Sequence, residues 1–296
     1  YNIDPAEIKK KITSRTKALI PVHYTGQPCD MDEIMKIARE HGLLVIEDGA
    51  HALGAVYKGK RIGSIADMTC FSFHPVKPIT TGEGGMIVTD NEELYRRLVL
   101  YRSHGITRDQ GLMQEYQDRE QNSDVPEIAE AAEMLQGDVK DPGGWYYQQL
   151  ELGYNYRITD IACALGASQM NKLDGFLKRR REIAARYDEA FKNIQQIQIP
   201  RQQEGCESGW HLYMIQSLKR DRRKVFDGLR KEGIGVNVHY IPVYRHPYYQ
   251  RNGYAGVCCP KAEKYYERAI SLPIHPQLTE KQQDYVIDQV ICECTK

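Results

Sequence analysis

The sequence predicts an α/β fold with a mainly parallel sheet, helices on both of its faces, and a small C-terminal α+β domain. Two observations lead to this prediction. Short apolar runs alternate with amphipathic helical segments in the first part of the chain, which is typical of βα units. A long helical stretch then separates them from a second group of strands and helices. With 296 residues, the chain can form one large domain or two smaller ones.

The first part of the chain supplies the strands of the main sheet. A helix capped by Asp30 is expected over residues 30–41, and a second helix, capped by Asn91, is expected to run to about Ser103. The polar stretch 107–144 is interpreted as a partly helical surface insertion, because its apolar periodicity is weak. The predicted strands are residues 18–22, 43–47, 68–73 and 86–89.

The second part begins with the long helical stretch, residues 159–193, in which Asp174 and Gly175 predict a break. The predicted chain therefore has three parts: a large domain over residues 1–158, the connecting helix, and a small domain over residues 194–296. Within the small domain, strands are expected at residues 212–218 and 235–239, and helices at residues 222–231, 260–269 and 279–294.

Charge and cysteine spacing argue against several classes of function. The 40 basic and 40 acidic side chains are mixed along the chain, so neither a nucleic acid nor an anionic membrane is an expected partner. The eight cysteines lack paired C-x-x-C spacing, which favours free thiols and no metal. No apolar window is long enough to cross a membrane and no leader is recognised, so a cytoplasmic protein acting on small molecules is expected.

One predicted strand ends directly in an acidic pair, Glu47 and Asp48, within the sequence Val-Ile-Glu-Asp-Gly-Ala-His of residues 45–51. Ligands of open parallel sheets bind at the carboxyl ends of the strands. A carboxylate at this position can cap a helix, bind a metal or pair with a protonated ring nitrogen. The pattern alone leaves these roles open.

The most informative segment is Phe-Ser-Phe-His-Pro-Val-Lys-Pro-Ile-Thr-Thr-Gly-Glu-Gly-Gly, residues 71–85. It places Lys77 between two prolines, on a stiff loop between a predicted strand and a glycine-rich turn. Desolvation disfavours the ammonium form, so a lysine at a partly buried cleft can react as an amine and form a Schiff base. The turn could instead bind a nucleotide phosphate, but no G-K-[ST] follows it and the next element is a strand.

Three motifs in series carry a resemblance to a known family: residues 48–51, residues 71–85, and Gly-Tyr-Asn-Tyr-Arg at residues 153–157. Together they resemble the DegT/DnrJ/EryC1/StrS family of sugar aminotransferases, which use pyridoxal 5′-phosphate (PLP) and have the aspartate-aminotransferase-like fold type I. The family more often has Asp-Ala-Ala where this chain has Asp-Gly-Ala. Its members also carry a segment before the position of Tyr1, in which a helix N-terminus helps to hold phosphate.

The resemblance implies roles for individual residues. Lys77 would form the Schiff base with PLP and then move the proton between the substrate carbon and the cofactor. Asp48 would pair with the pyridinium nitrogen, and His51 would lie against the cofactor ring or its 3′ oxygen. Ser72 would bind the phosphate. Asn155 would reach the phosphate from the partner subunit, which implies a homodimer with shared active sites.

Residues 238–247 combine aromatic and cationic side chains, which suit a nucleotide sugar by stacking on its base and pairing with its diphosphate. The segment is similar to the one that closes over substrate in the branch of the family that aminates UDP-4-keto-6-deoxy-hexosamines on the route to pseudaminic acid. This resemblance implies substrate contacts for His239, Tyr240 and Arg245.

The resulting hypothesis is a PLP-dependent transaminase that moves an amino group, expected from L-glutamate, to a keto carbon, expected to be C4, of a nucleotide-linked deoxysugar. Two alternatives stay open: a PLP- or pyridoxamine-phosphate-dependent sugar dehydratase, in which histidine replaces the lysine, and a non-catalytic fragment or binding protein. An NAD-linked oxidoreductase fits only generically, because no G-x-G-x-x-G lies between a strand and a helix. Arg102 and Arg157 are candidates for the donor carboxylate, with surface salt bridges as their alternative role.

Overall fold

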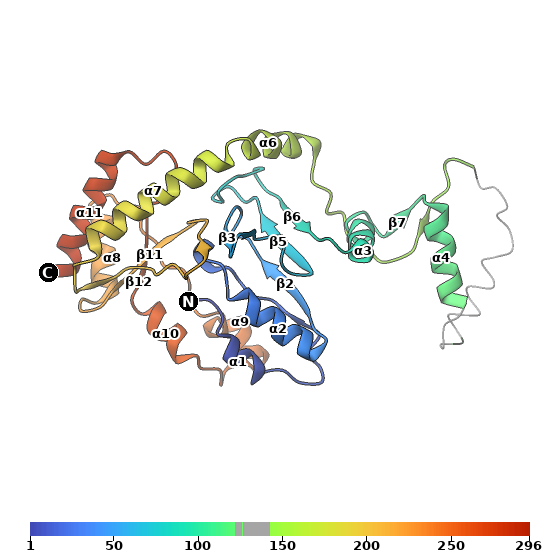
Figure 1. Ribbon diagram of the computed structural model, residues 1–296, viewed down its shortest axis with the longest axis horizontal. Helices are drawn as coiled ribbons and strands as arrows, with labels where there is room; N and C mark the ends of the chain where they lie inside the picture. Colours follow the sequence, from blue (N-terminus) through green and yellow to red (C-terminus); the bar gives the residue numbers. More distant parts are fainter. Residues whose placement is uncertain (122–125, 127–142) are drawn as a thin grey trace. The chain divides into compact units, whose positions relative to one another are not determined.

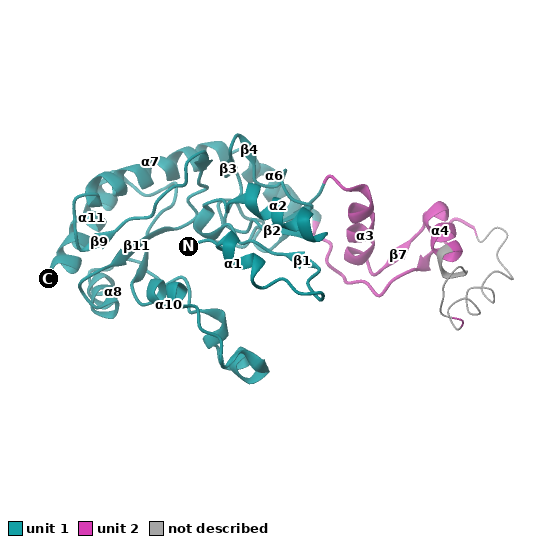
Figure 2. Ribbon diagram, turned by 60° about the horizontal axis from the view of Figure 1, so that its bottom comes forward, with its two compact units in different colours: residues 1–89, 160–296 teal, residues 90–159 magenta. Residues whose placement is uncertain are grey.

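The computed structural model describes residues 1–121, 126 and 143–296. The chain forms two compact units, drawn in different colours in Figure 2. The first unit contains Tyr1–Thr89 and Asp160–Lys296, and the second contains Asp90–Thr159.

The first unit contains a four-stranded sheet in the order β1-β2-β5-β6. Figure 1 labels β2, β5 and β6, and Figure 2 labels β1. The first three strands pair in parallel and β6 pairs antiparallel to β5, which confirms the prediction of a mainly parallel sheet. β1 is shorter than predicted: Pro21 has no N–H to donate, and the chain rejoins β2 only through a bridge between Val22 and Asp48. The strands are β1 (Ala18–Leu19), β2 (Leu44–Asp48), β5 (Met68–Ser72) and β6 (Gly85–Val88).

Helices α1 (Pro5–Lys9) and α2 (Met31–His41) cover this sheet with an apolar face. The buried residues of α2 follow helical spacing and join one core cluster with Val45 of β2. The predicted cap at Asp30 is wrong in its chemistry. Its carboxylate makes no capping bond and instead accepts a hydrogen bond from the Tyr57 hydroxyl at 3.0 Å. The helix ends at Gly42, whose φ of 62° is the left-handed conformation that glycine adopts readily.

The predicted long helix is two helices, α6 (Asp160–Met170) and α7 (Leu173–Phe191), which follow one another in Figure 1. The break lies at residues 171–172, not at Asp174 and Gly175 as expected. Asp174 is in the first turn of α7, where the partial positive charge of the helix N-terminus favours a carboxylate. The role of residues 159–193 as a connection between domains stays a prediction.

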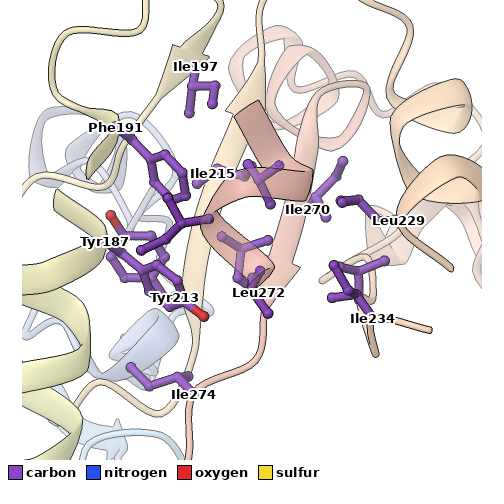
Figure 3. Packing of buried hydrophobic residues seen from close by; sticks show 14 of the residues in the cluster. Tyr187, Phe191, Ile197, Tyr213, Ile215, Leu229, Ile234, Ile270, Leu272 and Ile274 are labelled. Atoms are coloured by element: carbon purple, nitrogen blue, oxygen red, sulfur yellow. The ribbon is translucent and has the colours of Figure 1, made fainter. Parts of the chain in front are cut away.

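The C-terminal part forms a three-stranded antiparallel sheet in the order β12-β11-β9, as expected of an α+β domain. Helix α11 contacts α7 and α8, and α8 contacts β11 and β12. In the core between them, Tyr187 of α7 lies beside Tyr213 of β11, with 4.9 Å between ring centroids (Figure 3). The elements are β9 (Ile197–Gln198), β11 (Tyr213–Ser217), β12 (Ala269–Leu272), α8 (Arg222–Lys231) and α11 (Glu280–Thr295).

The strand predicted at residues 235–239 is wrong, because only an isolated bridge between Asn237 and Ser271 forms there. The Asn237 side chain accepts the N–H of Val238 at 2.8 Å and so ends the pairing. The remaining elements of the first unit are short: η1 (Tyr24–Gly26), β3 (Val56–Tyr57), β4 (Lys60–Arg61), β10 (Cys206–Glu207), η2 (Val243–Arg245), α9 (Pro247–Tyr249), η3 (Gln250–Tyr254) and α10 (Pro260–Tyr266).

The second unit contains α3 (Glu92–Arg102), which Asn91 caps as predicted by accepting the Leu94 N–H at 3.0 Å. It also contains the paired strands β7 (Ile106–Thr107) and β8 (Gln148–Gln149), and helix α4 (Gln110–Gln121). Much of the predicted insertion, residues 107–144, lies outside the described residues. Of the helices that the structure describes, none has the length and apolar character needed to span a lipid bilayer.

Candidate active site

Lys77 lines an open cavity of about 1000 Å³ in the first unit. The cavity lies among the loop after β5, the α7 surface, and the chain around β11 and β12. It brings together four of the residues singled out from the sequence: Ser72, Lys77, His239 and Tyr240. A cavity of this size with several convergent polar groups is typical of a small-molecule site.

The acidic pair at the end of β2 divides into two roles because successive residues of a strand point to opposite faces. Glu47 is fully buried and accepts hydrogen bonds from Thr69 Oγ1 at 2.5 Å and from His23 Nε2 at 3.1 Å. His23 Nδ1 accepts the backbone N–H of Cys29 at 3.0 Å, so its ring proton belongs on Nε2. Glu47 is thereby committed to the interior, and Asp48 is the member of the pair left for the site.

Asp48 is partly buried, and its Oδ1 accepts the Ala50 N–H at 3.0 Å. The next residue, Gly49, is where this chain departs from the common family motif. A Cβ at Gly49 would lie 2.9 Å from the Phe71 ring and 3.0 Å from the Thr69 methyl group. Glycine therefore leaves room for the Phe71 ring of the neighbouring strand without moving the carboxylate.

The loop that carries Lys77 is held by several hydrogen bonds. The Lys77 N–H bonds the His74 carbonyl at 3.0 Å. The carbonyl of Phe73 accepts both the Thr81 N–H, at 3.1 Å, and the Thr80 hydroxyl, at 3.0 Å. Burial lowers the pKa of the half-buried Lys77 amine, and the negative charge of Asp48 partly opposes this shift. Lys77 is thus a positioned lysine with an increased fraction of free amine.

Ser72 ends β5, where it pairs with Gly85 of β6. Its Oγ accepts only a long contact, 3.4 Å, from the His74 N–H. The hydroxyl therefore retains the capacity to donate a hydrogen bond to a ligand oxygen.

His51 is 8% exposed, and burial lowers its pKa to about 3, with smaller contributions from the charges of Lys77 and His239. The imidazole is therefore neutral, and its Nδ1 accepts the Thr25 N–H at 3.3 Å. Its ring lies 4.5 Å from that of His211. A neutral, fixed imidazole close to Lys77 suits contact with an aromatic ligand without adding charge.

His239 is held at the cavity by residues that the sequence did not indicate, and the Tyr240 ring lies 4.6 Å from the His239 ring. The Tyr24 hydroxyl donates to the His239 carbonyl at 2.5 Å, and His239 Nδ1 lies 3.0 Å from Ser271 Oγ. Burial raises the pKa of Tyr240, and Asp48 adds to the shift. Burial also lowers the pKa of His239, so both side chains are uncharged at neutral pH and can offer hydrogen bonds to a substrate.

Asp48 and His51 are not among the residues that line the Lys77 cavity, although their charges or rings act on Lys77 and its neighbours. The remaining residues singled out from the sequence are not lining residues either. Arg245 belongs to η2 and forms an ion pair with Glu263 at 2.5 Å. Glu263 also accepts a hydrogen bond from the Tyr244 hydroxyl. Asn155 belongs to the second unit, where it forms a bridge with Ser103. Arg102 and Arg157 also belong to that unit.

Sequence reasoning missed two further residues at the cavity, Arg180 and His211, which are 5% and 6% exposed. Arg180 stands in a run of basic residues on α7, which by itself is typical of a solvated helix face. The only available signal was the periodicity of α7, since Arg180 falls in register with Leu173, Leu177 and Ala184 on its buried face.

Comparison with known proteins identifies the family. The model of the DegT/DnrJ/EryC1/StrS aminotransferase family matches residues 1–291. The chain belongs to this family. Among curated members, the UDP-4-amino-4,6-dideoxy-N-acetyl-β-L-altrosamine transaminase of Campylobacter jejuni is 34% identical over 293 residues, which are 97% of this chain and 69% of the relative. The resemblance seen in the sequence motifs is confirmed.

Solved structures of aminotransferases share the fold. PseC of Helicobacter pylori, described as an aminotransferase of pseudaminic acid biosynthesis, has a TM-score of 0.85 and 30% identity, over 99% of this chain and 71% of that chain. Spr1654 of Streptococcus pneumoniae, described as a sugar aminotransferase and solved in its pyridoxamine-phosphate (PMP) form, has a TM-score of 0.84 and 30% identity. The match covers 99% of this chain and 73% of that chain. These neighbours confirm the predicted fold class, the fold type I of PLP-dependent aminotransferases.

Proposed function

We propose that this protein is a PLP-dependent aminotransferase that transfers an amino group from L-glutamate to keto carbon C4 of a nucleotide-linked deoxysugar. The observation that carries the proposal is the half-buried Lys77, whose pKa is lowered in a cavity of a DegT/DnrJ/EryC1/StrS family fold. The Campylobacter relative is named for a UDP-linked amino-dideoxy sugar, which supports this substrate class.

The residues of the first unit fit PLP. Lys77 would hold the aldehyde carbon, the Asp48 carboxylate the ring nitrogen, the His51 imidazole the ring, and the Ser72 hydroxyl the phosphate. When bound, PLP supplies an aldehyde that condenses with primary amines and a ring that takes up the electron pair of a broken C–H bond. The fit rests on chemistry already present: a lysine with a lowered pKa, a carboxylate at a strand end, and a neutral imidazole.

The chain's own residues then account for the proton movements. The Lys77 amine accepts the proton from the α-carbon of glutamate and later returns a proton to the sugar carbon that receives the amino group. The Asp48 carboxylate stabilises a proton on a ring nitrogen by charge pairing. His51 stays neutral at physiological pH, so it adds no positive charge that would oppose this protonation.

The finer features of the proposal concern substrate and partner. His239 and Tyr240, at the cavity wall, contact the nucleotide sugar, and Arg245 contributes if it exchanges its Glu263 partner for the diphosphate. Asn155 reaches the phosphate from the partner subunit of a cytoplasmic homodimer. The stacked and exposed rings of Tyr154 and Tyr156, 4.7 Å apart, support an interface next to Asn155.

The first test is an absorption spectrum of the purified protein after addition of PLP and then of L-glutamate. We expect a visible band from lysine-linked cofactor, which glutamate bleaches, and no such band in Lys77→Ala. Lys58→Ala is the matched control, because Lys58 is exposed and paired with Asp32 at 2.6 Å. The proposal is wrong if the wild type and Lys77→Ala give the same spectrum.

A further inference from the structure

The most unusual charged group of the first unit is the guanidinium of Arg180. It is 5% exposed, and its Nη1 donates to the backbone carbonyls of Trp210 at 3.0 Å, His211 at 3.2 Å and Ile274 at 2.9 Å. Three fixed backbone acceptors determine the position of this nitrogen. The guanidinium is therefore oriented before any ligand binds.

The rest of the guanidinium lacks a partner within the described part of the chain. Arg180 Nε is buried without a hydrogen bond, and no described carboxylate forms an ion pair with Arg180. Its neighbours differ in having counterions: Arg179 pairs with Glu182 at 3.2 Å, and Arg181, whose Nε also lacks a hydrogen bond, pairs with Glu207 at 3.1 Å. A buried charge without a counterion is costly, so the arrangement points to an anion supplied from outside the chain.

Charge and access support the same conclusion. Burial lowers the pKa of Arg180 to about 10, so the group still carries its charge at neutral pH. It lines the Lys77 cavity, where Arg180 and Lys77 are the only lysine or arginine side chains among the described lining residues. An anion bound to Arg180 from this side therefore shares the cavity with Lys77.

His211 offers a second binding atom beside this group. Its side chain is 6% exposed, and its Nδ1 is buried without a hydrogen-bond partner in the described structure. Burial lowers the pKa of His211 to about 2, with smaller contributions from the charges of His51, Lys77, Arg180 and His239. A neutral imidazole can donate one hydrogen bond without adding charge.

We propose that Arg180 binds the α-carboxylate of the amino-acid donor and that His211 assists through its unpaired Nδ1. This inference rests on the aminotransferase function proposed above and names the donor subsite of the same cavity. The donor's carboxylate is attached to the carbon that bears its amine, so its binding group must lie in the cavity that holds Lys77. A single oriented guanidinium matches the charge and planar geometry of one carboxylate.

Kinetics of the donor half-reaction test this inference. In Arg180→Gln, kcat/KM for L-glutamate falls about 10- to 100-fold, the range for loss of a hydrogen-bonded charge partner. With n-butylamine, which lacks a carboxylate, the variant and the wild type react within about twofold, because no group of that amine meets Arg180. Arg181→Gln is the matched control and retains wild-type values for both amines.

A purely structural role for Arg180 would lower the rates with glutamate and n-butylamine equally, and that result overturns the inference. If Arg180→Gln does not fold, Arg180→Lys and His211→Phe decide. Arg180→Lys keeps the positive charge. His211→Phe keeps an aromatic ring and removes the ring nitrogens that can form hydrogen bonds. In both we expect selective loss of glutamate turnover relative to n-butylamine, and equal losses again contradict the inference.

Binding to the cofactor-free protein gives a readout that does not need turnover. We expect calorimetry to show binding of 2-oxoglutarate to the wild type, at least tenfold weaker binding to Arg180→Gln, and equal binding of UDP to both. Selective loss of UDP binding would assign the cation to the sugar nucleotide and overturn the inference. If n-butylamine bleaches the cofactor band of the wild type but glutamate does not, glutamate is not the amino donor. If the wild type forms no cofactor band at all, the proposed function is wrong.

Discussion

Acidification should destabilise this protein through the buried side chains of His51 and His211, and His211 is the clearer case. Its side chain makes no hydrogen bond among the described residues, so His211→Phe removes a titrating group without breaking such a bond and keeps an aromatic ring beside His51. Burial lowers the pKa of His211 from 6.5 to about 2 and that of His51 to about 3. Both rings are therefore neutral in the folded protein at neutral pH.

The sign and size of the effect follow from proton linkage. In the unfolded chain a histidine binds a proton below about pH 6.5, whereas folded His211 stays neutral until the pH falls to about 2. The unfolded state therefore binds more protons, and the stability that is fully present above pH 6.5 is lost as the pH falls toward that value of about 2. Between pH 7.5 and pH 5, His51 and His211 each lower the free energy of unfolding by about 2 kcal/mol.

The assay is urea unfolding of cofactor-free wild type and His211→Phe at pH 7.5 and pH 5. Titration of carboxylates elsewhere affects both proteins alike, so the comparison isolates His211. We expect the wild type to lose about 2 kcal/mol more than the variant between the two pH values. An equal loss in both proteins would show that folded His211 accepts its proton near pH 6.5, and would refute the reasoning from burial.

Two further predictions concern the site and the core. The negative charge of Asp48 partly opposes the lowering of the Lys77 pKa by burial, so Asp48→Asn should lower this pKa further. The rate at which the protein captures PLP should then reach its plateau at a lower pH than in the wild type. A shift to higher pH would contradict this. Ile215→Ala removes a fully buried side chain and should cost about 2–5 kcal/mol by urea unfolding, whereas Ile20→Ala, at a position 61% exposed, should cost under about 0.5 kcal/mol; similar losses would contradict the core assignment.

Secondary structure was predictable where one residue's chemistry settles it. Asn91 caps α3, and Arg222–Lys231 is a helix with the predicted bounds. Two predictions failed where a distant partner or a side chain competed with the local pattern. Tyr57 takes the carboxylate of Asp30 away from the helix end, and the Asn237 side chain interrupts a strand pattern. Local propensity cannot reveal the competition at Asp30, because the fold brings Tyr57 there from 27 residues away.

The sequence by itself determined the family and the loop chemistry of the candidate site. Two prolines and a glycine-rich turn around Lys77 are local features, and they define a stiff loop whatever the rest of the chain does. The alternation of a strand also separates Glu47 from Asp48. Only the tertiary structure decided which of the two is committed to the interior, because His23 lies 24 residues away in the chain.

The tertiary structure alone also decided the role of Arg180. Its three carbonyl acceptors lie 30, 31 and 94 residues further along the chain. In sequence, Arg180 is one of several neighbouring basic residues of one helix. Its burial, its missing counterion and its place at the cavity set it apart only in the folded protein. Burial, pairing and cavity access are properties of the folded neighbourhood, so they arise from packing between distant segments and not from any local pattern.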